Sequence, residues 1–111
     1  MKTSEVLRAA KALPWAAKDF AKNKDGEGVS PLSPDATCFC AYGAVARVLG
    51  IANIGEIPIS EDPEAMRFLR DALPAGAWGS ITIFSDHKPE AERLAWWDRA
   101  IELAEKAEAA P

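Results

Sequence analysis

The chain has 111 residues, of which 49% are hydrophobic and 27% are charged, with a formal net charge of −4. This length indicates a single domain, residues 1–111, that is long enough to bury one hydrophobic core, and the composition excludes a collagen-like chain and a disulfide scaffold. Alanine supplies 22 of the hydrophobic residues, whereas Leu, Ile, Val and Phe together supply only 23, which predicts closely packed helices and a core volume filled by the four tryptophans.

The first half of the chain predicts two helices separated by a loop. Ser4 is placed to cap a helix over about residues 5–13, which Pro14 ends. Asp25-Gly26 is the strongest turn signal and predicts a small hairpin or an ordered loop. The segment 37–50 carries a single charge, Arg47, and predicts a buried central helix over 36–49, capped by Thr37 or Asp35 and ended by Gly50.

The second half predicts two further helices. Asp62-Pro63-Glu64 is typical of a helix start, and the helix that follows would bury Met66, Leu69 and Leu73 before Pro74. Residues 75–79 predict a loop carrying Trp78, and the β-branched run 81–84 predicts a strand or a buried extended segment. The final helix, residues 89–108, has one apolar stripe through Leu94, Trp97, Ile101 and Ala104 and a second through Trp96, Ala100 and Leu103, so it presents a wide apolar face.

Charge is distributed unevenly along the chain. Residues 1–24 hold six basic and two acidic side chains, whereas residues 25–111 hold seven basic and fifteen acidic ones. Because no nucleic-acid motif accompanies the basic segment, we expect a solvated helix face, and nucleic-acid binding is the third hypothesis for function. The longest uncharged apolar run, residues 38–46, is too short for a membrane span. The lack of a secretory signal and the close spacing of Cys38 and Cys40 predict a reduced, cytoplasmic protein.

Four segments in this order resemble a group of small bacterial and phage-encoded proteins classified only as a domain of unknown function. They are a Trp-containing segment that runs through an Asp-Gly turn (15–31), CAYGAV (40–45), FSDHKP (84–89) and WDRAIELA (97–104). The chain departs from this pattern at Ser85, where the pattern usually has Asn. The resemblance implies one small, mainly helical domain from a bacterium or phage, and it implies no reaction, ligand or cofactor.

The sharpest catalytic hypothesis is a cysteine hydrolase-like enzyme that uses Cys40. A cysteine in the first turn of a helix has its thiolate favoured by the helix dipole, and His87, the single histidine, would act as the base with Asp86 beside it. A buried, inert thiol is the competing interpretation, because the predicted helix is apolar almost all round.

A metal site built from Cys38, Cys40, Asp86 and His87 is disfavoured. In a helix, two cysteines two positions apart point in nearly opposite directions and cannot share one ion. We therefore expect no metal and no cofactor.

The step from Phe84 to Pro89 has a structural interpretation, because Ser85 or Asp86 can cap the final helix. Arg47, on a buried helix, needs a carboxylate or carbonyl partner, and Asp86 and Asp98 are the candidates.

The tryptophans offer a hypothesis about partner binding. Four of them are difficult to bury in 111 residues. One interpretation places Trp15, Trp78 and Trp97 in the core, and the other leaves Trp96 or Trp15 partly exposed as an anchor for a partner.

These observations predict a compact single domain, mainly α, with four principal helices around residues 36–49 and a small hairpin near Asp25-Gly26. We expect a non-enzymatic, protein-binding accessory module, with a homodimer as one form of that interaction. The cysteine hydrolase hypothesis is the alternative.

Overall fold

The computed structural model describes residues 1–75 and 80–110, and within these residues the protein is mainly α-helical, as the sequence predicts. The elements in chain order are α1 (Thr3–Lys11), β1 (Ala21–Lys22), β2 (Cys38–Phe39), α2 (Ala41–Leu49), the 3-10 helices η1 (Ile54–Glu56) and η2 (Ile59–Glu61), α3 (Glu64–Asp71), α4 (Ile81–His87) and α5 (Glu90–Ala109). Five α-helices are thus present in the described residues where four were predicted. The predicted loop carrying Trp78 lies outside the described residues except at Ala75.

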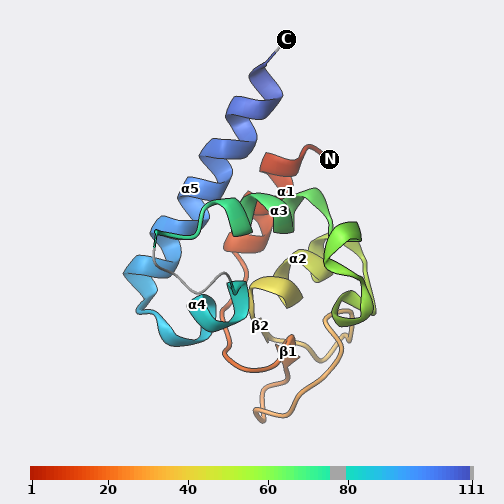
Figure 1. Cartoon of the computed structure of the whole chain (residues 1–111). Coiled ribbons are helices and arrows are strands. Elements are labelled where there is room, and N and C mark those ends of the chain that lie inside the picture. The colour runs from red at the N-terminus through yellow and green to blue at the C-terminus, as the bar shows by residue number, and fades with distance from the viewer. Residues whose placement is uncertain (76–79, 111) are drawn as a thin grey trace.

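The helices pack around both α1 and α2. α1 packs against α2, α3 and α5, and α2 packs in addition against α3, α4 and β2. Figure 1 shows α5 along one side of the molecule, with its last turns extending past α1, while the short strands lie at the opposite end. No helix in residues 1–75 or 80–110 combines the length and the apolar character needed to cross a membrane.

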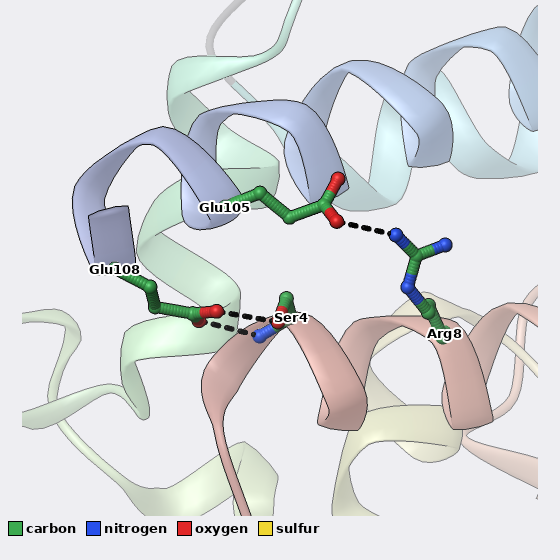
Figure 2. Close-up of polar contacts among 4 residues, drawn as sticks. All are labelled: Ser4, Arg8, Glu105 and Glu108. Atoms are coloured by element: carbon green, nitrogen blue, oxygen red, sulfur yellow. Dashed lines mark hydrogen bonds and ion pairs between the residues drawn. The ribbon is translucent and has the colours of Figure 1, made fainter.

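α1 begins two residues before the predicted start. Its N-cap is Lys2, whose backbone N–H donates to the Glu5 carboxylate at 3.0 Å, so the prediction that Ser4 caps this helix is wrong. Ser4 instead donates its backbone N–H and its hydroxyl to the two carboxylate oxygens of Glu108, at 3.0 and 2.6 Å. Arg8 pairs with Glu105 at 2.6 Å, and Figure 2 shows how these contacts fasten α1 to the last turns of α5.

α2 is shorter at its start than the predicted helix over 36–49, and neither Thr37 nor Asp35 caps it. The backbone N–H groups of Thr37 and Phe39 donate to the carbonyls of Lys22 and Pro14, both at 2.8 Å, so this segment bonds to other parts of the chain instead of to its own next turn. β2 accordingly pairs antiparallel with β1, in the register Ala21 with Phe39 and Lys22 with Cys38. Gly50, at φ +76°, ends α2 as predicted, because glycine adopts this left-handed conformation without strain.

The turn at Asp25-Gly26 is confirmed. The Gly26 N–H donates to the Asn23 carbonyl at 3.0 Å and Gly26 has φ +81°, while the Asn23 side chain accepts from the backbone N–H groups of Asp25 and Glu27. A small hairpin is also present, and its two strands, β1 and β2, pair across the whole loop 23–37.

Arg47 finds carbonyl partners and not carboxylates. Its Nη1 donates to the carbonyls of Pro31 and Ser33 at 3.0 and 2.9 Å, so the proposed pairing with Asp86 or Asp98 is wrong. The half-buried guanidinium therefore holds the loop before β2 against α2.

α3 buries Met66 and Leu69 fully and Leu73 partly, as predicted. Its N-cap is Pro63, without a side-chain hydrogen bond, and the buried Asp62 carboxylate pairs with Arg70 instead of capping the helix. The helix ends at Asp71, three residues before Pro74.

The prediction of a strand at residues 81–84 is wrong, because these residues begin α4. The Ser80 hydroxyl caps the helix by accepting from the Ile83 N–H at 3.2 Å. Helical spacing then buries Ile81, Phe84 and Ser85 on one side. Tertiary packing outweighs the β preference of the branched residues.

α5 has the wide apolar face predicted, since Trp96, Trp97, Ala100, Ile101 and Ala104 are buried. Leu94, expected on the inward stripe, is instead 38% exposed. Pro89 is the N-cap of α5, and no side-chain hydrogen bond caps the helix. The prediction that Ser85 or Asp86 caps this helix is therefore wrong.

Candidate functional site

The Trp15 pocket is a cavity of about 260 Å³ between the end of α1, the start of α2 and the first half of α5. Its walls include Trp15, Phe39, Cys40, Arg93, Leu94 and Trp97. It brings together residues from three separate parts of the chain. We therefore treat it as the candidate functional site.

Trp15 is 43% exposed, yet several contacts hold it in place. Its backbone forms a bridge with Phe39, and the flanking residues are fixed by hydrogen bonds from the Phe39 N–H to the Pro14 carbonyl at 2.8 Å and from the Ala16 N–H to the Phe39 carbonyl at 2.9 Å. The indole N–H lies 3.4 Å from Ser85 Oγ, its acceptor. The Arg93 guanidinium carbon lies 3.7 Å from the centroid of the ring, a close cation–π contact.

Arg93 is only 8% exposed, although it carries a full charge. Its Nε is buried and has no hydrogen-bond partner within the described residues. Burial lowers the pKa of the guanidinium, while the charge of Glu90 raises it. Because the pKa of arginine in proteins stays far above neutral pH, the guanidinium keeps its proton. The pocket wall therefore holds a charged group whose hydrogen-bonding capacity is not filled by the parts of the protein described.

Cys40 also lies in the wall of this pocket, as the N-cap of α2. Its Sγ accepts from the Gly43 N–H at 3.5 Å, which supplies one of the missing partners at the start of a helix. Burial raises the pKa of the thiol; the backbone N–H groups of Gly43 and Tyr42 act in the opposite direction, and the charge of Asp86 raises the pKa further. The neutral thiol is thus the favoured form at neutral pH.

A second, smaller cavity of about 160 Å³ also borders Cys40. It is lined by Lys18, Asp19, Phe20, Cys40, Thr82 and Asp86. Lys18 has φ +75°, a left-handed conformation that costs energy for a residue with a side chain. Asp86 Oδ1 is buried there without a hydrogen-bond partner in the described residues.

The structure brings together two members of the catalytic hypothesis and leaves out the third. Cys40 and Asp86 share the smaller cavity, but His87 is exposed at the end of α4 and lines neither cavity. The hypothesis requires His87 as the base for the thiol, and this arrangement does not supply that contact. The reactivity of Cys40 stays a prediction.

The argument against a metal site assumed that Cys38 and Cys40 lie in one helix, and this premise is wrong. Cys38 lies in β2, with its Sγ directed to the Lys22 carbonyl at 3.8 Å, whereas Cys40 caps α2. Across residues 1–75 and 80–110, no three His, Cys, Asp or Glu side chains are grouped as metal ligands would be.

Trp96 is fully buried, so the expectation that its ring is exposed is wrong. Its indole N–H donates to the Leu69 carbonyl at 2.7 Å, and its ring packs edge-on against Phe84. Trp97 is buried as predicted, whereas Trp15, expected in the core under the first interpretation, is partly exposed.

Half of the cations in the basic N-terminal segment are paired with carboxylates. Arg8 and Lys11 contact Glu105 and Asp98, each at 2.6 Å, and Lys22 lies 4.0 Å from Asp19. Since these three of the six cations face carboxylates, the segment presents less unpaired positive charge than its sequence suggests.

Sequence reasoning missed Arg93 as a site residue. The signal was present, because Arg93 lies three and four residues before Trp96 and Trp97 and so falls on the buried face of the final helix. A charged side chain on an apolar helix face indicates a special environment.

Fold and site together define a small, mainly α-helical domain with an aromatic–guanidinium pocket. The chain belongs to the Family of unknown function (DUF6197), whose model matches residues 1–103. Searches among curated proteins and among solved structures found no match. The structure adds a physical explanation for CAYGAV in this chain, where the cysteine caps α2 and the glycine lets the preceding loop approach the helix.

Proposed function

We propose that the protein is a non-enzymatic binding module that contacts another polypeptide through Trp15 and the pocket beside it. The observation that carries this proposal is that Trp15 is both exposed and fixed, by Ser85 and by Arg93. Tryptophan is enriched among the residues that dominate binding energy at interfaces. A side chain already held in one orientation loses little conformational entropy on binding.

The setting that we propose is the bacterial or phage cytoplasm. The resemblance noted from the sequence supports the origin. Cys38 and Cys40, both free thiols, support a reducing compartment. A second copy of the chain is an alternative partner, which light scattering across a range of concentrations would detect as a homodimer.

The test is a comparison of captured partners between matched variants. Trp15→Ala removes the exposed ring, and Leu49→Ala removes an apolar side chain of similar exposure at the far end of α2. We expect a partner from the native host to be retained by the wild type and by the Leu49 variant and lost by the Trp15 variant, with all three chains folded by circular dichroism. Equal retention by both variants would contradict the proposal.

A further inference from the structure

The guanidinium of Arg93, unlike those of four other arginines, has no hydrogen-bond acceptor within the described residues. Four others each donate to an acceptor there: Arg8 to Glu105, Arg47 to Pro31 and Ser33, Arg70 to Asp62, and Arg99 to Ala72. Arg93 is more deeply buried than any of these, yet no hydrogen bond or ion pair within residues 1–75 and 80–110 involves its side chain. Burying a charge without a partner is costly, which indicates that an acceptor is supplied from outside the chain.

The geometry of the pocket determines where that acceptor would lie. The Arg93 guanidinium lies over the Trp15 ring, with its carbon 3.7 Å from the ring centroid. Since the N–H groups of a guanidinium lie in its plane, stacking leaves them directed away from the ring. The cavity of about 260 Å³ that Arg93 lines has the size for one amino-acid side chain and is smaller than most sites for cofactors.

The charges around the pocket favour a singly charged ligand. The second cation in its wall, Lys11, is already paired with Asp98 at 2.6 Å. Glu90, also in the wall, adds a negative charge. Glu90 acts on Arg93 at longer range, but no ion pair joins them among the described residues. The guanidinium is therefore open to one ligand anion, and its geometry and single charge match the two parallel oxygens of a carboxylate better than the charge of a phosphate.

We propose that the Trp15 pocket binds a carboxylate group through the in-plane N–H groups of Arg93. The apolar part of the same ligand residue lies against Trp15, Leu94 and Trp97, which form the apolar wall. The inference rests on the proposed function in taking the carboxylate from a polypeptide, either from an acidic side chain or from a chain end.

The experiment uses the purified, isotope-labelled full chain and small probes, so its outcome does not depend on finding a partner. The resonances of the Arg93 Nε–H and the Trp15 indole N–H are followed by NMR during titration. The probes are N-acetyl-leucine, with a chain-end carboxylate; N-acetylglutamic acid α-amide, with a side-chain carboxylate; N-acetyl-leucinamide, with none; and inorganic phosphate. Saturable shifts with one or both carboxylates and none with N-acetyl-leucinamide are expected, and the stronger carboxylate probe identifies the source.

Three variants assign the effect to Arg93. Arg93→Met should abolish carboxylate binding, and Arg93→Lys, which keeps the charge and loses the paired N–H groups, should weaken it at least about tenfold. Arg67→Met is the matched control, because Arg67 is exposed on α3 and no ion pair within the described residues involves it. The Trp15 resonance reports binding in all variants, and the lysine variant keeps the test available where the methionine variant does not fold.

The outcomes separate the inference from the proposed function. Equal shifts with N-acetyl-leucine and N-acetyl-leucinamide, tighter binding of phosphate, an absence of saturable shifts, or an equal loss in the Arg67 variant would each overturn carboxylate binding. Loss of partner capture by Trp15→Ala without any carboxylate binding would leave the protein-binding function standing alone. Carboxylate binding with no effect of Trp15→Ala on capture would support the pocket and contradict the proposed function.

Discussion

Replacing Gly43 with alanine should destabilise the protein because the loop before β1 passes directly over this residue. A Cβ atom built at Gly43 would lie 1.6 Å from the Phe20 carbonyl oxygen and 2.5 Å from the carbonyl carbon. These are backbone atoms, so relief requires the whole segment 18–20 to move. That movement also breaks the hydrogen bond from the Cys40 N–H to the Phe20 carbonyl, 3.3 Å long.

The net magnitude follows from three opposing contributions. Alanine in place of glycine inside a helix stabilises by about 1 kcal/mol. Overpacking costs about 1–3 kcal/mol and more where backbone must shift, and the lost hydrogen bond costs about 1 kcal/mol. With a clash this severe, we expect the free energy of unfolding to fall by about 2–3 kcal/mol, which corresponds to a decrease in Tm of roughly 10 °C or more.

The assay is urea unfolding followed by circular dichroism and tryptophan fluorescence, with Gly55→Ala as the control. A Cβ at Gly55 would also meet Phe20, but at the end of its ring, 2.7 Å from Cε2, and a ring can rotate away. We therefore expect the Gly55 variant to lose less than about 1 kcal/mol. A Gly43 variant as stable as the wild type, or one no less stable than the Gly55 variant, would refute this account of the loop.

Three further predictions concern Glu108, Cys40 and Trp96. The hydrogen bonds from the Ser4 hydroxyl and N–H hold the pKa of Glu108 below its usual range, so its stabilising effect is present above the unfolded pKa of about 4.3 and is lost as the pH falls through the lower folded value. Glu108→Gln should therefore lower Tm at pH 7, and its Tm should converge with that of the wild type in acid. As a control, Glu102→Gln breaks an exposed pair with Lys106 at 3.3 Å and should show a smaller change at pH 7. A constant Tm difference between Glu108→Gln and the wild type across this pH range would contradict the linkage. Because burial raises the pKa of Cys40, iodoacetamide at pH 7 should modify this thiol far more slowly in the native protein than in urea, as read by mass spectrometry; equal rates would restore the nucleophile hypothesis. Trp96→Phe should cost about 2–4 kcal/mol in urea unfolding, since it leaves a cavity and removes the bond to the Leu69 carbonyl; a loss below 1 kcal/mol would show that the core repacks.

Local signals in the sequence predicted the elements that depend on local chemistry. Gly50 and Gly26 adopt the left-handed conformations that ended α2 and formed the turn. The apolar stripes of the final helix predicted which face of α5 is buried, except at Leu94, because helical periodicity places these residues on one side.

The errors arose where distant segments decide the conformation. Nothing near Thr37 or Phe39 indicates that their N–H groups bond to Lys22 and Pro14, so residues 36–40 were predicted to continue α2. The run at 81–84 has strand-forming residues, but its burial against other helices favours α4. Composition left open whether Trp96 or Trp15 is exposed. The structure encloses Trp96 against Phe84 and the Leu69 carbonyl and leaves Trp15 partly exposed.

The contact between Ser4 and Glu108 joins residues 104 positions apart. Closing a flexible loop of that length costs roughly 4 kcal/mol of chain entropy at room temperature. The contacts between α1 and α5 must offset this cost when the two helices meet. Proteins dominated by such distant contacts fold slowly. A circular permutant that connects the two ends through a short linker and opens the chain near Gly26 would make the α1–α5 contact local, so it should fold faster than the natural order while keeping the same packed helices.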